Sequence, residues 1–259
     1  MSTGSFAHLT VELQGSVAVV GLNRPDKRNA IHDPLIDEIH QFFSAPPEGV
    51  RVVVLHGHGP HFSSGLDLSE HRDRDAFEVM LHSQKWHRTF HAVQLGGLPV
   101  VTAMQGAVVG GGLELATSTH VRVAEPSTFY ALPEGQRGIF VGGGGSVRIA
   151  RVIGAGRMAE MMLTGHAYNA QEGQAMGLSH HLVGEGEALP KALDLARRIA
   201  DNAPLSNYAV VNALPRIADM AQSEGLFTES LMAAMAQTST EARERMRAFL
   251  EKRGPKAGA

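Results

Sequence analysis

Short apolar segments alternate with helical patterns along most of the chain. Six segments have the length and β-branched composition of buried strands: 17–22, 50–55, 100–104, 120–124, 128–131 and 181–183. Apolar residues at helical spacing occupy much of the sequence between them, over 34–44, 75–94, 112–117, 146–153 and 157–163. This alternation predicts an α/β fold in which crossover connections leave the strands buried.

The sequence from about Gln171 onward is mostly helical. Amphipathic patterns cover 189–201, 205–221, 224–237 and 240–252. Pro204 can begin a helix and Pro215 is expected to kink or split one, because proline fits only the first helical turn. No repeat or low-complexity linker interrupts the chain. We therefore expect one domain, with a core over 1–200 and a helical segment over 201–259.

Composition and charge exclude several functional classes. The chain has no cysteine, which rules out disulfides, thiol catalysis and cysteine-ligated zinc. A net charge of −3 provides no basic field for nucleic acid. The sequence has no signal-peptide pattern and no apolar run of about 18 residues, so we expect a cytoplasmic protein without membrane spans. His56, His58 and His61 lack metal-ligand spacing, so no metal site is predicted.

Glycine is concentrated in one region, with twelve of the 29 glycines between Gly96 and Gly145. The first cluster, 110–112, stands where a strand ends and a helix begins. The unpaired N–H groups and positive dipole end of a helix start can hold an oxyanion that forms during a reaction. The second cluster, 142–145, lacks the motifs of nucleotide-binding loops, so close backbone packing beside a ligand is the better interpretation.

Two carboxylates and one loop complete the candidate chemistry. Glu114 falls in the first turn of the helix after the first glycine cluster, where it could instead merely complement the helix dipole. Glu134 follows Pro133 at a strand end, where it could instead be a solvated loop residue. In the segment 61–68, small residues allow a ligand to approach the main chain, although an ordinary turn capped by Asp67 is the alternative.

In this order and spacing, the segments resemble the crotonase (enoyl-CoA hydratase/isomerase) superfamily over about 17–252. Each of five stretches is similar to a family motif: 23–30 to the NRPxxxNA turn, 62–68 to F-x-x-G-x-D-[IL], 106–116 to GxxxGGGxEL, 161–178 to LTG…A…GL, and 246–253 to the C-terminal helix. The resemblance implies a crotonase-like spiral of ββα turns. It also implies that 201–259 forms a helical segment for trimerisation and for the CoA site.

The resemblance assigns roles to particular residues. It implies that the backbone N–H groups of Leu66 and Gly111 form an oxyanion hole and that Glu114 and Glu134 are the catalytic pair. Further contacts with the acyl-CoA substrate are implied at Lys27, Arg28, Ser63, Ser64, Gly65, Asp67, Leu68, Gly110, Pro133, Gly142, Phe249 and Lys252. No separate cofactor is expected, because CoA is part of the substrate. The expected assembly is a homotrimer or a homohexamer built from two trimers.

We therefore expect an enoyl-CoA hydratase, a hydro-lyase that adds water reversibly to a trans-2-enoyl-CoA and gives the 3-hydroxyacyl-CoA. Glu114 is the preferred water activator and Glu134 the preferred proton donor to C2, although the pair can share one proton. Retention of both glutamates favours a hydratase over an isomerase, which can work with one acid. His82, Trp86 and Phe90 lie at helical spacing, where core packing is preferred over contact with the acyl chain.

Three alternatives stay open. The glycines at 142–145 replace a proline-containing family loop, which suggests a hydratase for a short sulfur-containing enoyl-CoA, such as methylthioacryloyl-CoA, with thioester hydrolysis. An enoyl-CoA isomerase is the second alternative. A non-catalytic acyl-CoA-binding or RNA-binding member of the family is the third, and the negative net charge argues against RNA.

Overall fold

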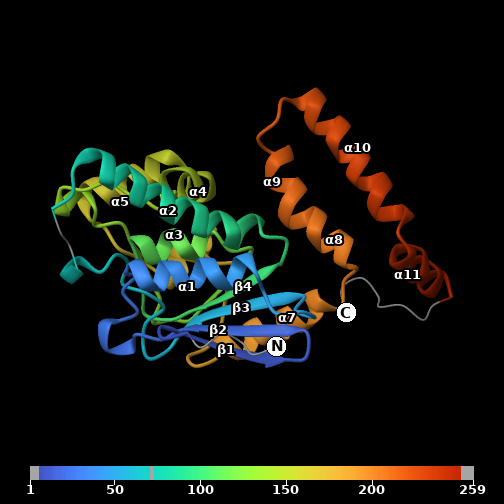
Figure 1. Cartoon of the computed structure of the whole chain (residues 1–259), viewed down its shortest axis with the longest axis horizontal. Coiled ribbons are helices and arrows are strands. Elements are labelled where there is room, and N and C mark those ends of the chain that lie inside the picture. Colours follow the sequence, from blue (N-terminus) through green and yellow to red (C-terminus); the bar gives the residue numbers. More distant parts are fainter. Residues whose placement is uncertain (1–5, 71–72, 252–259) are drawn as a thin grey trace. The chain divides into compact units, whose positions relative to one another are not determined.

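The computed structural model describes residues 6–70 and 73–251 (Figure 1). The chain divides into two compact units, one up to Ala200 and one from Asp201 onward. Lys252, one of the predicted substrate contacts, lies outside the described residues.

A six-stranded sheet forms the base of the first unit, in the order β1-β2-β3-β4-β6-β9. Its strands are β1 (Leu9–Gln14), β2 (Val17–Leu22), β3 (Val52–Gly57), β4 (Val100–Met104), β6 (Val121–Ala124) and β9 (His181–Leu182). Only β1 pairs antiparallel, with β2, and the other neighbours are parallel. Every residue of β2 and β4 is buried, as expected for a parallel sheet covered on both faces. The predicted α/β class is confirmed.

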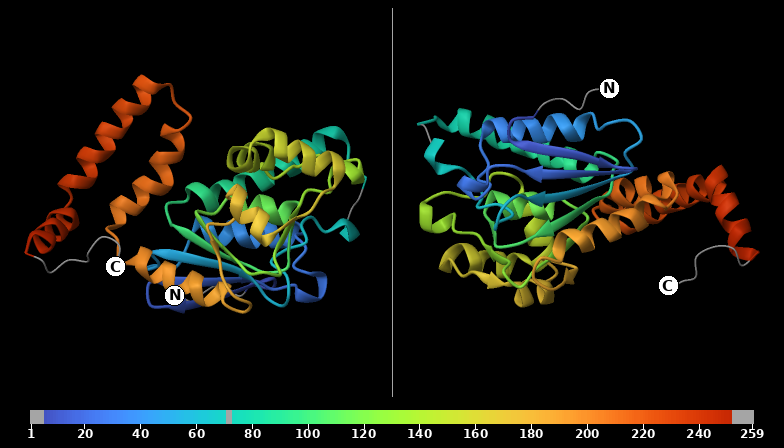
Figure 2. Two further views of the ribbon diagram at one scale, coloured as in Figure 1. Left: turned by 180° about the vertical axis from the view of Figure 1, so that it is seen from behind. Right: turned by 90° about the horizontal axis from the view of Figure 1, so that it is seen from below.

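Helices cover both faces of this sheet (Figures 1 and 2). Alternate side chains of β2, such as Val17 and Val19, pack with the alanines of α7 (Ala188–Ala200) on one face. The intervening residues, such as Ala18 and Val20, belong to the larger core on the other face. That core includes buried side chains of α1 (Asp33–Ser44), α2 (Ala76–Leu95) and α3 (Gly111–Thr117).

A second, three-stranded sheet positions the functional segments. It consists of β5 (Ala107–Val109), β7 (Phe129–Ala131) and β8 (Tyr168–Asn169). β5 and β7 are parallel, with Val109 opposite Ala131, and the Gly110 N–H donates to the Ala131 carbonyl at 2.9 Å. The carboxyl ends of these two strands therefore lie together, which brings the start of α3 beside the segment that follows β7.

Several short helices complete the first unit. They are α4 (Gly145–Ile153), α5 (Ala155–Thr164), α6 (Ala170–Met176) and three 3-10 turns, η1 (Pro25–Lys27), η2 (Leu68–Glu70) and η3 (Gly135–Arg137). Neither α6 nor the strands β1, β5 and β8 were expected from the sequence patterns. No helix in the described part of the chain is both long and apolar enough to cross a membrane.

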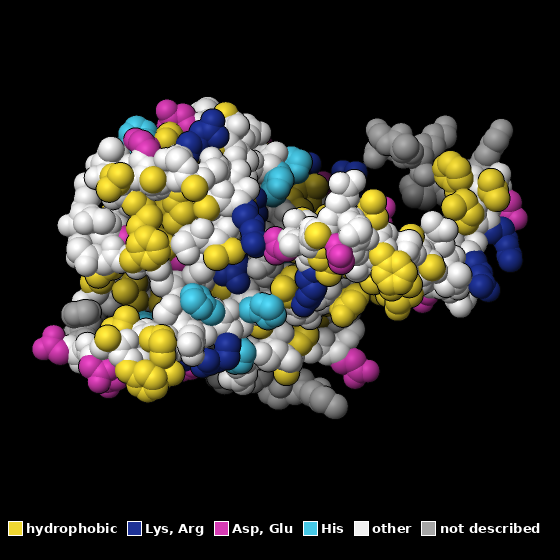
Figure 3. Space-filling model, turned by 90° about the horizontal axis from the view of Figure 1, so that it is seen from above, with side chains coloured by type: hydrophobic (Ala, Val, Ile, Leu, Met, Phe, Trp, Pro, Cys, Tyr) yellow, Lys and Arg dark blue, Asp and Glu magenta, His cyan; other side chains and the backbone are white. Residues whose placement is uncertain are grey.

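The second unit is entirely helical in its described part. Its elements are α8 (Pro204–Tyr208), a π-helical turn η4 (Ala209–Ala213), α9 (Leu214–Ile217), α10 (Gln222–Thr238) and α11 (Thr240–Leu250). Pro204 begins α8 and Pro215 stands in the first turn of α9, and the helix expected over 205–221 continues without a gap from Pro204 to Ile217, with the π-helical turn directly before α9. Apolar side chains are visible on the surface of this unit in Figure 3, and Leu226, Phe227, Leu231 and Met235 of α10 are exposed.

Candidate active site

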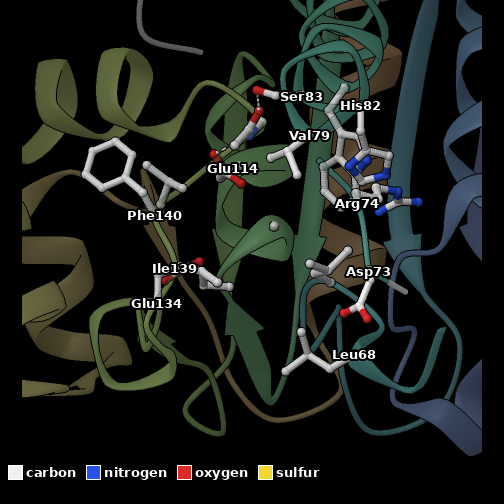
Figure 4. Close-up of a pocket in the computed structure, with 16 residues that line it drawn as sticks. Leu68, Asp73, Arg74, Val79, His82, Ser83, Glu114, Glu134, Ile139 and Phe140 are labelled. Carbon is white, nitrogen blue, oxygen red and sulfur yellow. Dashed lines mark hydrogen bonds between the residues drawn. The ribbon is translucent and has the colours of Figure 1, made fainter. Parts of the chain in front are cut away.

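A cavity of about 290 Å³ lies in the first unit. Its walls come from α2, the start of α3 and the segment that follows β7 (Figure 4). Six of the predicted site residues line it: Leu66, Leu68, Gly111, Glu114, Glu134 and Gly142. A mostly apolar hollow with a few converging polar groups is the usual form of a small-molecule site.

Two backbone N–H groups in the cavity wall have no acceptor among the described residues. Gly111 is the first residue of α3, so its N–H has no partner within the helix. Leu66 lies beside Gly111, because Gly65, the residue before it, packs against Gly111. A Cβ atom added to Gly65 would stand 3.1 Å from the Gly111 nitrogen. Among the hydrogen bonds of residues 6–70 and 73–251, neither the Leu66 nor the Gly111 N–H appears as a donor. The two groups are available to a ligand oxygen.

The loop that presents Leu66 is fixed by buried polar contacts. Asn29 donates to the carbonyls of His58 and His61, at 2.9 and 2.8 Å. The Ser63 hydroxyl donates to the Asn29 carbonyl at 2.8 Å, and Asp67 forms an ion pair with Arg24 at 2.9 Å. The predicted substrate contacts Ser63 and Asp67 thus use their side chains to support the loop, and neither lines the cavity.

Glu114 reaches the cavity from the first turn of α3 and is held by backbone amides. The N–H groups of Gly143 and Gly145 both donate to Glu114 Oε1, at 2.9 and 2.7 Å. A Cβ on Gly143 would stand 3.0 Å from Glu114 Oε2, and one on Gly145 would stand 2.9 Å from Oε1. The second glycine cluster therefore allows the main chain to approach a carboxylate of the protein itself. The second glycine cluster thus has two roles: it lines the cavity, and it contacts Glu114.

Glu134 enters the same cavity from the segment after β7. Gly110, at φ +53°, turns the main chain beneath it, and a Cβ there would stand 2.8 Å from Glu134 Oε1. Glycine at 110 thus provides both the backbone conformation and the space for the carboxyl group. Glu134 Oε2 is buried and has no hydrogen-bond partner in the described part of the molecule. A buried unpaired oxygen of this kind is costly unless a ligand or water satisfies it.

The pKa values of both carboxyl groups are raised. Burial, together with the charge of Glu134 and against the lowering effect of the two amides, raises the pKa of Glu114 to about 7. Burial also raises the pKa of Glu134. Figure 4 shows both groups on one side of the cavity, across from His82 and Arg74. Such paired, desolvated carboxyl groups are suited to moving protons near neutral pH.

The cavity also contains residues that the sequence patterns did not single out. The newly found lining residues are Asp73, Arg74, Val79 and Ser83, whereas Ile139, Phe140, Val141 and Gly143 belong to or adjoin the second glycine cluster. Trp86 and Phe90 pack in the hydrophobic core as preferred, and Trp86 and His82 also line the cavity. Helical spacing could have indicated Val79 with His82 and Trp86, one turn apart on α2.

The remaining predicted contacts lie outside the cavity lining. This group consists of Lys27, Arg28, Ser64, Gly65, Gly110 and Pro133 in the first unit. Phe249 stands on α11 in the second unit and is exposed. Their contact with the substrate stays a prediction. Within the described residues, no group of three or more His, Asp or Glu side chains is placed to hold a metal ion.

Comparison with known proteins gives consistent relatives over nearly the whole chain. The family model described as enoyl-CoA hydratase/isomerase matches residues 12–258. The chain is 30% identical to enoyl-CoA hydratase EchA19 of Mycobacterium tuberculosis, over 95% of this chain and 94% of that protein. It is 31% identical to 2,3-dehydroadipyl-CoA hydratase of Escherichia coli, over 96% and 98%. A crystal structure of a "putative enoyl-CoA hydratase" from Rhodopseudomonas palustris is 54% identical, with a TM-score of 0.93 over 97% and 98% of the two chains.

Proposed function

Because the chain belongs to the enoyl-CoA hydratase/isomerase family of the crotonase superfamily, we propose that it adds water reversibly to a trans-2-enoyl-CoA. The product is the 3-hydroxyacyl-CoA. One observation carries the proposal: Glu114 and Glu134 share a cavity with the unpaired N–H groups of Leu66 and Gly111. These are the groups that hydration of an enoyl thioester requires.

The two N–H groups serve the thioester oxygen. When water attacks C3, the electron pair of the double bond moves toward the carbonyl, and negative charge gathers on that oxygen. Two backbone donors that are already in place stabilise this enolate without reorganisation. Removing one such donor typically costs about 2.7–4 kcal/mol of transition-state stabilisation. The side chain of Leu66 is not needed for this role, because the donor belongs to the main chain.

The two carboxyl groups divide the proton transfers. The amides of Gly143 and Gly145 favour the ionised form of Glu114, so we assign it as the base that takes a proton from the attacking water. Among the described residues, Glu134 Oε2 has no hydrogen-bond partner and no backbone amide favours its ionised form through that oxygen, so we assign Glu134 as the acid that protonates C2. The new C3–O and C2–H bonds together add one water, and proton exchange between the carboxyl groups restores the starting state.

Isomerisation is the competing activity within the family. Moving a double bond requires removal of one proton and its return, which a single carboxyl group can perform. If Glu134 were that group, the two amides that hold Glu114 and the glycines at 143 and 145 that make room for it would serve no purpose in the reaction. These contacts favour hydration.

We propose in addition that the second unit mediates assembly into trimers or hexamers and contributes Phe249 and Lys252 to CoA binding. Apolar side chains along α10, among them Phe227 and Leu231, are exposed in the single chain, which supports an oligomer that covers them. Light scattering at low concentration should give a mass of three or six chains. A monomer would contradict this part of the proposal.

A substrate panel tests the proposed reaction. Purified protein is incubated with enoyl-CoAs of short, medium, branched and methylthio-substituted acyl groups, and the absorbance of the conjugated thioester is followed. Mass spectrometry should detect the addition of one water, while free CoA reports thioester hydrolysis and a 3-enoyl-CoA reports isomerisation. Loss of the absorbance with formation of the hydroxyacyl product is expected. No hydration of any member would contradict the proposal.

A further inference from the structure

The amides that bind Glu114 belong to a segment that other side chains hold in place. We call residues 142–145 the glycine segment. Resting on the proposed function above, we propose that Ser83 and Arg148 are positioning residues that fix this segment, and through it the Glu114 carboxyl group, for proton transfer. Neither residue was marked by a sequence motif.

Ser83 acts on one end of a single peptide group. Its hydroxyl donates to the Gly142 carbonyl at 2.6 Å (Figure 4). That carbonyl and the Gly143 N–H belong to the same peptide group, and the N–H donates to Glu114 Oε1 at 2.9 Å. Hydrogen bonds in such a chain polarise one another, so the Ser83 hydroxyl strengthens the amide as a donor to Glu114.

Arg148 fixes the next peptide group of the glycine segment. Its Nη1 donates to the Gly143 carbonyl at 3.0 Å, and its Nε donates to Gln94 Oε1 on α2 at 2.7 Å. The peptide group that Arg148 holds lies between the two whose amides bind Glu114. The planar guanidinium thereby ties the glycine segment to α2, a geometry that a lysine ammonium cannot reproduce.

Arg148 also places a positive charge near Glu114. Its charge lowers the pKa of Glu114, whereas Glu134, on the segment after β7, raises it. On α2, His87 lies beside Ser83, with its Nε2 atom 3.3 Å from the Ser83 hydroxyl oxygen. Burial and the positive charge of Arg148 lower the pKa of His87. Among the ion pairs of the described residues, none includes Arg148. Its charge therefore acts on the site without a carboxylate bound directly to it.

Three variants separate these effects. Arg148→Gln removes the charge, Arg148→Lys keeps the charge but loses the planar two-sided contact, and Ser83→Ala removes the bond to the Gly142 carbonyl. Arg151→Gln is the matched control, because it makes the same change in charge on an exposed position of the same helix. Thermal melts confirm that each variant is folded before it is assayed.

The first readout does not depend on catalysis. NMR titration of protein labelled with carboxyl-¹³C glutamate gives the pKa of Glu114, with the signal assigned from Glu114→Gln. The proposal expects Arg148→Gln to raise this pKa, Arg148→Lys to keep it near the wild-type value and Arg151→Gln to leave it unchanged. An unchanged Glu114 signal in Arg148→Gln would overturn the proposal. A shifted signal in a protein without hydratase activity would instead uphold the positioning and reject the proposed function.

The second readout is kinetic. Because Ser83 and Arg148 act through Glu114, each variant of these two residues should lower kcat about tenfold, the effect of losing one hydrogen bond. KM should change by less than about threefold. In a Glu114→Gln background, Arg148→Gln and Ser83→Ala should cause no further loss. Equal losses of kcat in both backgrounds would mean that the two residues act independently of Glu114 and would overturn the proposal.

Discussion

The Gly145 N–H lies 2.7 Å from Oε1 of Glu114, although the two residues are 31 positions apart in the chain. This contact joins the start of α4 to the first turn of α3. It gives a carboxylate in an almost water-free position two backbone donors, the second from Gly143. The glycine segment is therefore part of the acid–base apparatus of the cavity as well as a wall of it.

Gly145→Ala should impair catalysis more than stability. The added methyl would stand 2.9 Å from both Cγ and Oε1 of Glu114, so the carboxyl group must move. We expect kcat to fall at least about tenfold, because the displaced carboxyl loses one or both amide bonds. Gly156→Ala on α5 is the control, since a methyl there meets nothing within 4 Å and alanine is a better helix former. Wild-type kcat in Gly145→Ala would refute the importance of this contact.

The backbone N–H at 66, and not the leucine side chain, should carry the oxyanion role. Leu66→Ala is expected to keep kcat within a few fold. Replacing Leu66 by its α-hydroxy acid through nonsense suppression turns the amide into an ester and removes only the donor. That change should lower kcat by about 10²–10³-fold. A larger loss from the alanine variant than from the ester would show that the side chain matters instead.

The pH profile of hydration should reflect the raised pKa of Glu114. If the ionised carboxylate is the base, kcat/KM should increase with pH and reach half of its plateau at about pH 7, the raised pKa of this group. An ordinary carboxylate would already be ionised by pH 5.5. A profile that is flat between pH 5.5 and 8 would contradict the assignment of Glu114 as the base.

The buried Glu114 carboxyl group should lower the free energy of unfolding at alkaline pH. Its folded-state pKa of about 7 exceeds the unfolded value of 4.5, so the folded state loses stability as pH rises from 4.5 through 7. Glu114→Gln removes this cost, and its free energy of unfolding at pH 8 should exceed that of the wild type by up to about 3 kcal/mol. The gain should vanish near pH 4.5. Urea denaturation at both pH values checks this, and a less stable variant at pH 8 would be the contrary result.

His120 should contribute the opposite pH dependence. Burial lowers its pKa to about 4, and its ring accepts from the Val100 N–H at 2.9 Å. In the unfolded chain the imidazole of His120 binds a proton near pH 6.5. The stabilisation of the folded state by neutral His120 is therefore complete above pH 6.5 and is lost as pH falls toward 4. Between pH 7.5 and 5 the loss from this residue is about 2 kcal/mol. Between pH 7.5 and 5, the free energy of unfolding should fall less in His120→Gln than in the wild type. An equal fall in the two proteins would contradict the account.

The sequence patterns predicted the long strands that are buried on both sides of the sheet and missed the edge strand β1. The valine-rich β2 and β4 are wholly buried, so composition alone marked them. β1 is an edge strand in which only Leu9 is buried, and its pattern carries little signal. α6 contains Gly173, which reads as a break, yet a Cβ there would collide with the ring of Tyr130. That requirement comes from tertiary packing, which no local pattern records.

The site residues that belong to sequence motifs could be predicted, and those outside motifs could not. The crotonase resemblance is confirmed by the family match and by the structural neighbours. It placed Leu66, Gly111, Glu114 and Glu134, which the fold brings into one cavity. The contacts of Gly143 and Gly145 with Glu114 were not predictable, because they depend on how α3 and α4 pack. Ser83 and Arg148 were missed for the same reason.

The central claim is that two carboxyl groups together add water to an enoyl-CoA. The most direct measurement is the hydration rate of Glu114→Gln and Glu134→Gln, each with the best enoyl-CoA of the panel, alongside the affinity for the hydroxyacyl-CoA product by calorimetry. The account predicts that each variant loses about 10²–10⁴-fold in kcat and binds the product within a few fold of the wild type. Near-wild-type hydration by either variant would contradict it.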